Sequence, residues 1–233
     1  MKRSKRYRTL LEKIDKNGIY DLREAIEKVK ELRSAKFTES VELTVKLKVD
    51  PKRHTVRGSV VLPHGTGKTR RVLVFTEEKE KEAKEAGADY VGSDDLIEKV
   101  SKGWFEFDYV IATPEVMKKV ARLGKILGPK GLMPSPKTGT VTQNVKEAIE
   151  AAKRGKVDFK MDKTGCIHGA IGKVDLDTDK LYENATQFLR GIWEARPQEV
   201  KGSYFESVYL SLTMSPSLRI NLQDAIKIAS RGE

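Results

Sequence analysis

The sequence predicts an α/β protein with two domains: a discontinuous α+β domain built from both chain ends and an inserted Rossmann-like α/β domain. Apolar and polar residues alternate near both ends of the chain, which is typical of a sheet with one open face. In the middle of the chain, strand patterns alternate with helix patterns, which favours a parallel sheet. Because the first pattern resumes after the second, we expect one domain from 1–65 with 157–233 and another from 66–156.

The N-terminal segment is expected to form two helices and two strands. The first helix is a basic segment, and the second begins after Asp21, which fits an N-cap with Glu24 three residues later. Apolar residues on one face predict that this second helix packs on the core: Leu22, Ala25, Ile26, Val29 and Leu32. Strands are expected from Ser40 to Val49 and from Val56 to Leu62.

The strand from Ser40 to Val49 alternates strictly. One side holds only apolar residues, namely Val41, Leu43, Val45, Leu47 and Val49. The other side holds Glu42, Thr44, Lys46 and Lys48. Since successive side chains of a strand point to opposite faces, one face is buried and the other is left for solvent or a ligand.

Beyond a short linker at Pro63 to Gly67, strands and helices alternate. The expected strands are Val72 to Phe75, Asp89 to Val91 and Tyr109 to Ala112. The expected helices run from Glu77 to Ala86, from Ser93, from Pro114 and from Asn144 to Arg154. Gly124 to Thr140 is dense in Gly, Pro and Lys and is expected to be an extended loop. After Gly155 we expect strands at Val157 to Met161, Cys166 to Ile171 and Tyr204 to Thr213, with a helix from Thr178 to Glu194.

The composition describes a protein that attracts polyanions. Its 233 residues carry a formal net charge of +11 with a pI near 9.5, which favours nucleic acid or anionic lipid as a partner. The sequence has no run of about 18 apolar residues and no signal-type segment, so we expect a cytoplasmic protein without a membrane partner. Residues 66–156 hold 18 basic and 14 acidic side chains and the remainder 27 and 20, which favours the discontinuous domain for binding.

Metal ions, cofactors and catalysis are not expected. Cys166 is the single cysteine and excludes an internal disulfide, and the three histidines show no metal-ligand spacing beside it. The segment around Lys68 ends like a phosphate-binding Gly-Lys-Thr loop, but Leu62 stands where that loop needs a glycine, and a strand follows instead of a helix. Cys166 and His168 share a strand face as a nucleophile and base would, although a half-buried cysteine beside a surface histidine is the simpler interpretation.

Basic residues stand at two places that suit a nucleic acid. The N-terminus interleaves an aromatic ring, Tyr7, with the cations Lys2, Arg3, Lys5, Arg6 and Arg8. Such a run can clamp a phosphate backbone, or can simply be solvated. Lys36 and Phe37 place a cation and an aromatic ring at the mouth of the alternating strand, a pairing that RNA-binding proteins use.

Several ordered motifs together are more specific than composition. They are Ala35-Lys36-Phe37, Val56-Arg57-Gly58, Leu62-Pro63-His64-Gly65, Ala112-Thr113-Pro114, Leu123 to Pro134, Asp162-Lys163-Thr164-Gly165 and Thr213-Met214. With them the chain resembles, essentially from end to end, the bacterial L-one family of ribosomal large-subunit proteins, which form part of the mobile side stalk. The resemblance implies a non-enzymatic constituent of the large ribosomal subunit whose first domain binds 23S rRNA and whose second domain moves on hinges near Gly65 and Lys156.

The resemblance also implies partners and site residues. The partners are the large ribosomal subunit, exit-site tRNA, whose movement and release the protein assists, and the mRNA of its own operon, whose translation it represses. The protein is expected to be ribosome-bound in the cytoplasm and a monomer when free. The predicted RNA-binding residues are Arg3, Arg6, Lys36, Phe37, Ser40, Glu42, Lys46, Lys163, Thr164, Gly165, His168, Thr213, Met214 and Ser215.

One position departs from the family pattern, and two other hypotheses remain open. Bacterial members have glycine after Thr213-Met214, where this chain has Ser215, so a glycine-only backbone angle or a close RNA approach there would be costly. A nucleotide-dependent enzyme using Lys68 would bind ATP or GTP. A regulator acting only on mRNA would not sediment with large subunits after a salt wash.

Overall fold

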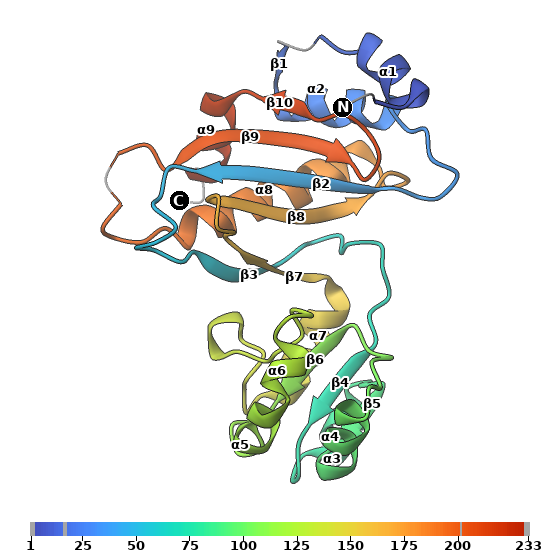
Figure 1. Cartoon of the computed structure of the whole chain (residues 1–233), viewed down its shortest axis with the longest axis vertical. Helices are drawn as coiled ribbons and strands as arrows, with labels where there is room; N and C mark the ends of the chain where they lie inside the picture. The colour runs from blue at the N-terminus through green and yellow to red at the C-terminus, as the bar shows by residue number, and fades with distance from the viewer. Residues whose placement is uncertain (1–2, 16–17, 201, 231–233) are drawn as a thin grey trace. The chain divides into compact units, whose positions relative to one another are not determined.

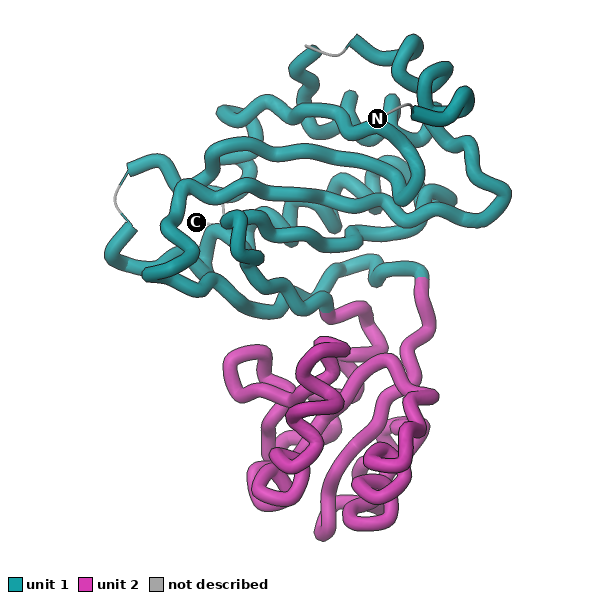
Figure 2. Tube along the Cα trace, viewed as in Figure 1, with its two compact units in different colours: residues 1–67, 157–233 teal, residues 68–156 magenta. Residues whose placement is uncertain are grey.

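The computed structural model describes residues 3–15, 18–200 and 202–230. The chain forms two compact units, shown in different colours in Figure 2: unit 1 comprises residues 1–67 and 157–233, and unit 2 comprises residues 68–156. Both units combine helices with sheets, so the mixed α/β fold class is confirmed. Among the described residues, no helix is both long enough and apolar enough to cross a membrane.

The main sheet of unit 1 has five strands in the order β1-β10-β9-β2-β8 (Figure 1). These strands are β1 (Ile19–Tyr20), β10 (Leu218–Ile220), β9 (Phe205–Leu212), β2 (Ser40–Leu47) and β8 (Cys166–Lys173). β1 runs parallel to β10, and the other neighbouring strands are antiparallel. Because β2 lies between β9 and β8, a strand from the N-terminal part of the chain pairs on both edges with strands from the C-terminal part.

Three helices pack on one face of this sheet: α2 (Leu22–Glu31), α8 (Thr178–Glu194) and α9 (Leu222–Ser230). The apolar side chains of β2 that point to this face are fully buried: Val41, Leu43, Val45 and Leu47. Complete burial of such a side chain stabilises the fold by about 1.5–3 kcal/mol, so this alternation fixes which face of β2 turns inward.

Three further elements complete unit 1. The first helix, α1 (Lys5–Glu12), begins after Ser4, whose hydroxyl accepts a hydrogen bond from the Tyr7 N–H. A second sheet pairs β3 (Arg57–Val61) with β7 (Lys156–Lys160), which starts at the last residue of unit 2. Helix α8 packs on β3 at Gly191, where an added Cβ would lie only 2.0 Å from Cγ2 of Val60.

Unit 2 has a parallel sheet in the order β5-β4-β6, formed by Tyr90–Gly92, Val72–Phe75 and Tyr109–Ala112. One face of the sheet shares an apolar core with α3 (Glu80–Glu85) and α7 (Val145–Arg154). The other face shares a core with α4 (Asp94–Ser101), α5 (Met117–Val120), η1 (Ala121–Leu123) and α6 (Gly124–Leu127). Helices on both faces explain why β4 and β6 are buried along their whole length.

Some elements differ from the sequence prediction. β1 and β10 have two and three residues, too few for an alternation to be recognised, and α9 was also not predicted. The segment expected to be an extended loop contains α6 and the short helix η2 (Pro136–Thr138), because Leu127 is buried in the core. Helix α3 starts three residues later than expected, at Glu80, because the Glu77 carboxylate instead accepts hydrogen bonds from Ser93 and Lys119.

Candidate nucleic-acid interface

Polar side chains line the face of the main sheet that points away from the buried core. On β2 they are Ser40, Glu42, Thr44 and Lys46, all half-buried. The strand register places Cys166, His168 and Ala170 of β8 on one side of them and Ser207, Tyr209 and Ser211 of β9 on the other. We call these ten residues the open face. Ser207, Tyr209 and Ser211 were not predicted, although they are the positions between the apolar residues of the last predicted strand.

One row of the open face continues across the whole sheet. His168 pairs with Thr44, Thr44 with Tyr209, Tyr209 with Arg219 and Arg219 with Ile19. Neighbouring strands lie about 4.8 Å apart, so the row offers a stretch of roughly 20 Å for a ligand that lies across the strands. Arg219 and Ile19 are both exposed, and the sequence pattern singled out neither.

The start of β2 meets the turn that follows β9. Thr213 bonds to Ser40 in both directions: its N–H donates to the Ser40 carbonyl at 3.1 Å, and its hydroxyl accepts from the Ser40 N–H at 3.1 Å. Beside this pair, Phe37 and Met214 are 52% and 45% exposed, and Lys36 is exposed as well. We call these five residues the Thr213 corner. Its apolar side chains suit base stacking, and its cation suits a phosphate.

A buried carboxylate, missed in the sequence analysis, fixes this corner. Glu39 has no exposed surface, and one of its oxygens accepts the N–H groups of Ser34 and Ala35 at 3.2 and 3.3 Å. The other oxygen accepts the Met214 N–H at 3.0 Å. Glu39 therefore ties the segment before β2 to the turn after β9. The alternation held part of the signal: the buried positions of β2 are odd-numbered, which indicates that Glu39 is buried but does not reveal its partners.

The two predicted arginines of the N-terminal segment differ in their surroundings. Arg6 donates to the hydroxyl of Ser34 at 2.7 Å, and the Ser34 N–H in turn donates to Glu39, so Arg6 lies next to the Thr213 corner. Arg3 precedes α1, is exposed, and lies over the ring of Tyr7 at 4.7 Å. Lys2, also named from the sequence, lies outside the described residues.

Ser215, the residue expected to depart from the family pattern, closes its own turn. Its hydroxyl accepts the Leu212 N–H at 2.9 Å and donates to the Pro216 carbonyl at 2.9 Å. Among the described residues, only glycines have a positive φ, so the backbone at Ser215 does not require glycine. The Ser215 hydroxyl therefore forms two local hydrogen bonds and is oriented toward the turn.

At the other end of β2, the turn from Asp162 to Cys166 is held by one carboxylate. A single Asp162 oxygen accepts the Thr164 N–H at 2.8 Å, the Thr164 hydroxyl at 2.7 Å and the Cys166 N–H at 2.8 Å. Gly165 has φ +81°, which favours glycine. The Lys46 ammonium donates to the Thr164 carbonyl, and Lys163 is exposed. We call this segment the Asp162 turn.

His168 links the Asp162 turn to the middle of the open face. Its Nδ1 lies 3.1 Å from the Thr44 hydroxyl, and its Nε2 lies 3.6 Å from an Asp162 oxygen. Both ring nitrogens therefore have partners other than Cys166, which argues against a cysteine–histidine catalytic pair. His168 instead presents an imidazole edge on a polar surface.

The ionisation of Asp162 gives a direct test of this turn. Hydrogen bonds from the Thr164 hydroxyl and the Cys166 N–H lower the pKa of Asp162 from 3.8 to about 2. Since the folded-state pKa is lowered, the stabilising effect is complete above about pH 4 and is lost as the pH falls toward 2. We expect Thr164→Val to raise the pKa toward 3.8 in a carboxyl ¹³C NMR titration. Lys163→Gln is the control and should leave the pKa of Asp162 unchanged. Equal Asp162 pKa values in wild type and Thr164→Val would show that the Thr164 hydroxyl does not lower this pKa.

The possible phosphate loop has a different environment. Lys68 lies 3.1 Å from a carboxylate oxygen of Asp108, so its charge is paired. The next regular element is strand β4 from Val72, and no helix N-terminus follows the glycines. Among the described residues, no group of three or more metal-ligating side chains is close enough to hold an ion.

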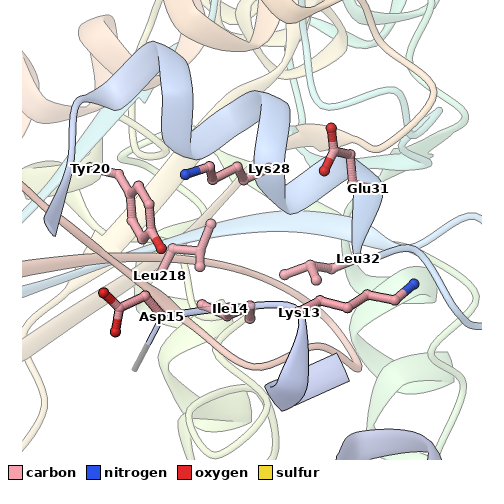
Figure 3. A pocket seen from close by; sticks show the side chains of 8 residues that line it. All are labelled: Lys13, Ile14, Asp15, Tyr20, Lys28, Glu31, Leu32 and Leu218. Atoms are coloured by element: carbon pink, nitrogen blue, oxygen red, sulfur yellow. The ribbon is translucent and has the colours of Figure 1, made fainter. Parts of the chain in front are cut away.

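A cavity of about 260 Å³ lies in unit 1 beside the end of α1 and the start of β10 (Figure 3). Its walls include Ile14, Leu32 and Leu218, and Lys28 lies over the ring of Tyr20 at 4.0 Å. The Lys28 ammonium also lies 2.8 Å from the carboxylate of Glu24, which is not part of the wall. None of the predicted RNA-binding residues lines this cavity.

The predicted residues therefore gather along one strand. The Thr213 corner and the Asp162 turn lie at opposite ends of β2, about 20 Å apart at 3.4 Å per residue, with Glu42 and His168 on the open face between them. Hydroxyl groups, amide groups and lysines on a rigid strand suit the ribose hydroxyls and phosphates of RNA. Arg3 is the predicted residue with the least connection to this surface.

Comparisons with known proteins identify the family of this chain. The sequence model of the Ribosomal protein L1p/L10e family matches residues 29–216. The chain belongs to this family. The large ribosomal subunit protein uL1 of Persephonella marina is 51% identical over 233 residues, which cover 97% of this chain and 96% of that protein. The uL1 proteins of Thermus thermophilus (51% over 224 residues) and Flavobacterium psychrophilum (48% over 223) each match 94% of this chain and 98% and 97% of their own length.

Membership in the ribosomal L1 family confirms the resemblance inferred from the motifs. Proteins of this family are structural components of the ribosome and not enzymes. The hypothesis of a nucleotide-dependent enzyme is therefore wrong, in agreement with the paired charge of Lys68.

Proposed function

We propose that this chain is a structural constituent of the large ribosomal subunit that binds 23S rRNA of the mobile side stalk through the open face and the Thr213 corner. The observation that carries the proposal is the pairing of two exposed apolar side chains, Phe37 and Met214, with a polar strand face that hydrogen bonds hold rigid. Exposed apolar groups beside cations are costly in water and useful against unstacked bases.

The open face also indicates how RNA would be recognised. Lys36, Lys46 and Lys163 supply charge for phosphates, while Thr44, Glu42 and His168 supply donors and acceptors for ribose and base edges. Because only part of this set is charged, binding should fall with salt but persist where a purely electrostatic complex would dissociate.

Substitution of the Thr213 corner tests the proposal. We expect Thr213→Val with Met214→Ala to weaken binding to an rRNA fragment carrying the side-stalk element by about 2 kcal/mol, as for the loss of a few specific contacts. Filter binding at several salt concentrations measures the change. Val61→Ala is the control, because Val61 is a comparably exposed apolar residue on β3, in the other sheet of unit 1. Equal affinities for the corner variant and the control would exclude this site.

We further propose that the same surface binds the mRNA of the chain's own operon, and that the ribosome-bound protein assists exit-site tRNA. A single RNA surface predicts that the mRNA leader and the rRNA fragment compete, with the corner variant losing both. The protein would be cytoplasmic and monomeric when free, with units 1 and 2 as separate domains. If a saturating rRNA fragment fails to displace the labelled leader, a second RNA site is required.

A further inference from the structure

The charges of unit 2 are strongly separated. Residues 116–146 contain seven basic and no acidic side chains, whereas the rest of residues 68–156 contains 11 basic and 14 acidic ones. The small net charge of the unit therefore hides one basic and one acidic part. The basic part includes the Gly-, Pro- and Lys-rich segment, which the open face of unit 1 does not use.

The basic part begins with an amphipathic helical run. α5, η1 and α6 follow one another without interruption from Met117 to Leu127 (Figure 1). On its inner side the run buries Val120, Leu123 and Leu127. On its outer side it exposes Lys118, Arg122 and Lys125. These cations are four and three residues apart, a spacing that places them on one helix face over about 10 Å.

The cations on this face have no acidic partner among the residues that the structure describes. The adjacent Lys119 shows the contrast, because its ammonium lies 2.7 Å from Glu77 and 2.9 Å from Asp94. Lys118, Arg122 and Lys125 form no such pair within the described ranges. A solvated lysine-rich helix normally alternates its charges, so three unpaired cations in a row favour an anionic partner.

A glycine exposes backbone beside these cations. Gly124 has a helical φ of −56°, and no heavy atom lies within 4 Å of a Cβ added there. Neither the backbone angle nor the packing requires glycine, although glycine weakens a helix relative to alanine. A bare backbone gives a partner room to approach closely. Nearby in the sequence, Lys130 adds a cation over the ring of Phe105 at 4.0 Å.

We propose that the helix face of Lys118, Arg122 and Lys125, with Gly124, binds the phosphodiester backbone of RNA. The inference rests on the proposed function, because a ribosomal protein is surrounded by RNA. Phosphates match three unpaired cations at helical spacing, and the acidic α3 and α4 repel the same strand. Ribosomal RNA and transfer RNA share this chemistry, and the source is resolved by experiment.

The experiment compares two full-length variants of equal charge. The first is Lys118→Gln/Arg122→Gln/Lys125→Gln, and the second is Lys81→Gln/Lys84→Gln/Lys99→Gln on α3 and α4. Binding to the side-stalk rRNA fragment and to deacylated tRNA is measured from low to high salt. For at least one RNA, the first variant should reduce the slope of log affinity against log salt by about 2 and weaken binding roughly tenfold at low salt. The RNA affected identifies the source.

Two outcomes overturn the inference: a wild-type slope for the first variant with both RNAs, or an equal reduction by the second variant. The Thr213→Val/Met214→Ala variant separates this result from the proposed function, because it should lose affinity with little change in slope. If the Lys118/Arg122/Lys125 variant keeps the wild-type slope while the Thr213→Val/Met214→Ala variant loses affinity, RNA binding by the basic helix face is rejected and RNA binding by the open face is retained. Lys125→Gln alone should lower the slope by about 0.8 if the triple variant unfolds.

Discussion

Glu39→Gln is expected to lower the free energy of unfolding by about 3 kcal/mol and to weaken RNA binding as well. The two carboxylate oxygens accept three backbone N–H groups, from Ser34, Ala35 and Met214, at a site without exposed surface. An amide offers one oxygen and one NH₂ group, so at least one of the three part-buried N–H groups faces a donor in place of an acceptor. Leaving such a donor unsatisfied costs about 1–3 kcal/mol, and loss of the charge-assisted bonds adds to this.

Urea denaturation and filter binding measure the two effects of Glu39→Gln. Glu42→Gln is the matched control for stability, because Glu42 is half-buried on the open face and its replacement should change unfolding by less than about 0.5 kcal/mol. Binding is compared well below the melting temperature, so that weaker binding reflects a displaced Thr213 corner and not unfolded protein. Identical unfolding curves for Glu39→Gln and wild type would show that this carboxylate does not hold the corner.

The polar face of β2 could be predicted because its signal is local. Alternation over eight residues identified which side chains turn away from the core, and the resemblance then selected Ser40, Glu42 and Lys46. Glu39 escaped notice because an acidic residue at a buried position is interpretable only when its three N–H partners are known, and Met214 is 175 residues away. A local pattern holds no information about such a partner.

The sequence also could not predict which residues pair across neighbouring strands. Ile19 and Arg219 are partners 200 residues apart, and the strands that carry them are too short to show a period. Tyr209 therefore entered the open face only when β9 was placed beside β2. The helical run from Met117 to Leu127 was missed in part because a local signal was misleading. Gly124 and Gly128 indicate a loop, but burial of Leu123 and Leu127 in the core stabilises the helical conformation.

Gly169→Ala is expected to destabilise unit 1 by about 3 kcal/mol, at the upper end of the usual cost of overpacking. Gly169 lies on β8 opposite Leu43, and an added Cβ would lie 2.2 Å from Cζ of the buried Phe188 ring. Phe188 cannot easily withdraw, because its ring packs edge-on against Phe159 with 5.9 Å between the centroids. Strand β8 must then shift, and His168 shifts with it, so RNA affinity should fall as well.

Two further variants separate this clash from a general effect of replacing glycine. Gly124→Ala makes the same change in a helix where no atom lies within 4 Å of the new Cβ, so it should stabilise the protein by up to about 1 kcal/mol. Phe188→Leu removes the part of the ring that the new methyl group would meet. In thermal denaturation, Gly169→Ala should therefore cost less in a Phe188→Leu background than in wild type. A cost that is the same in both backgrounds would mean that Gly169 is needed for its backbone and not for the space it leaves to Phe188.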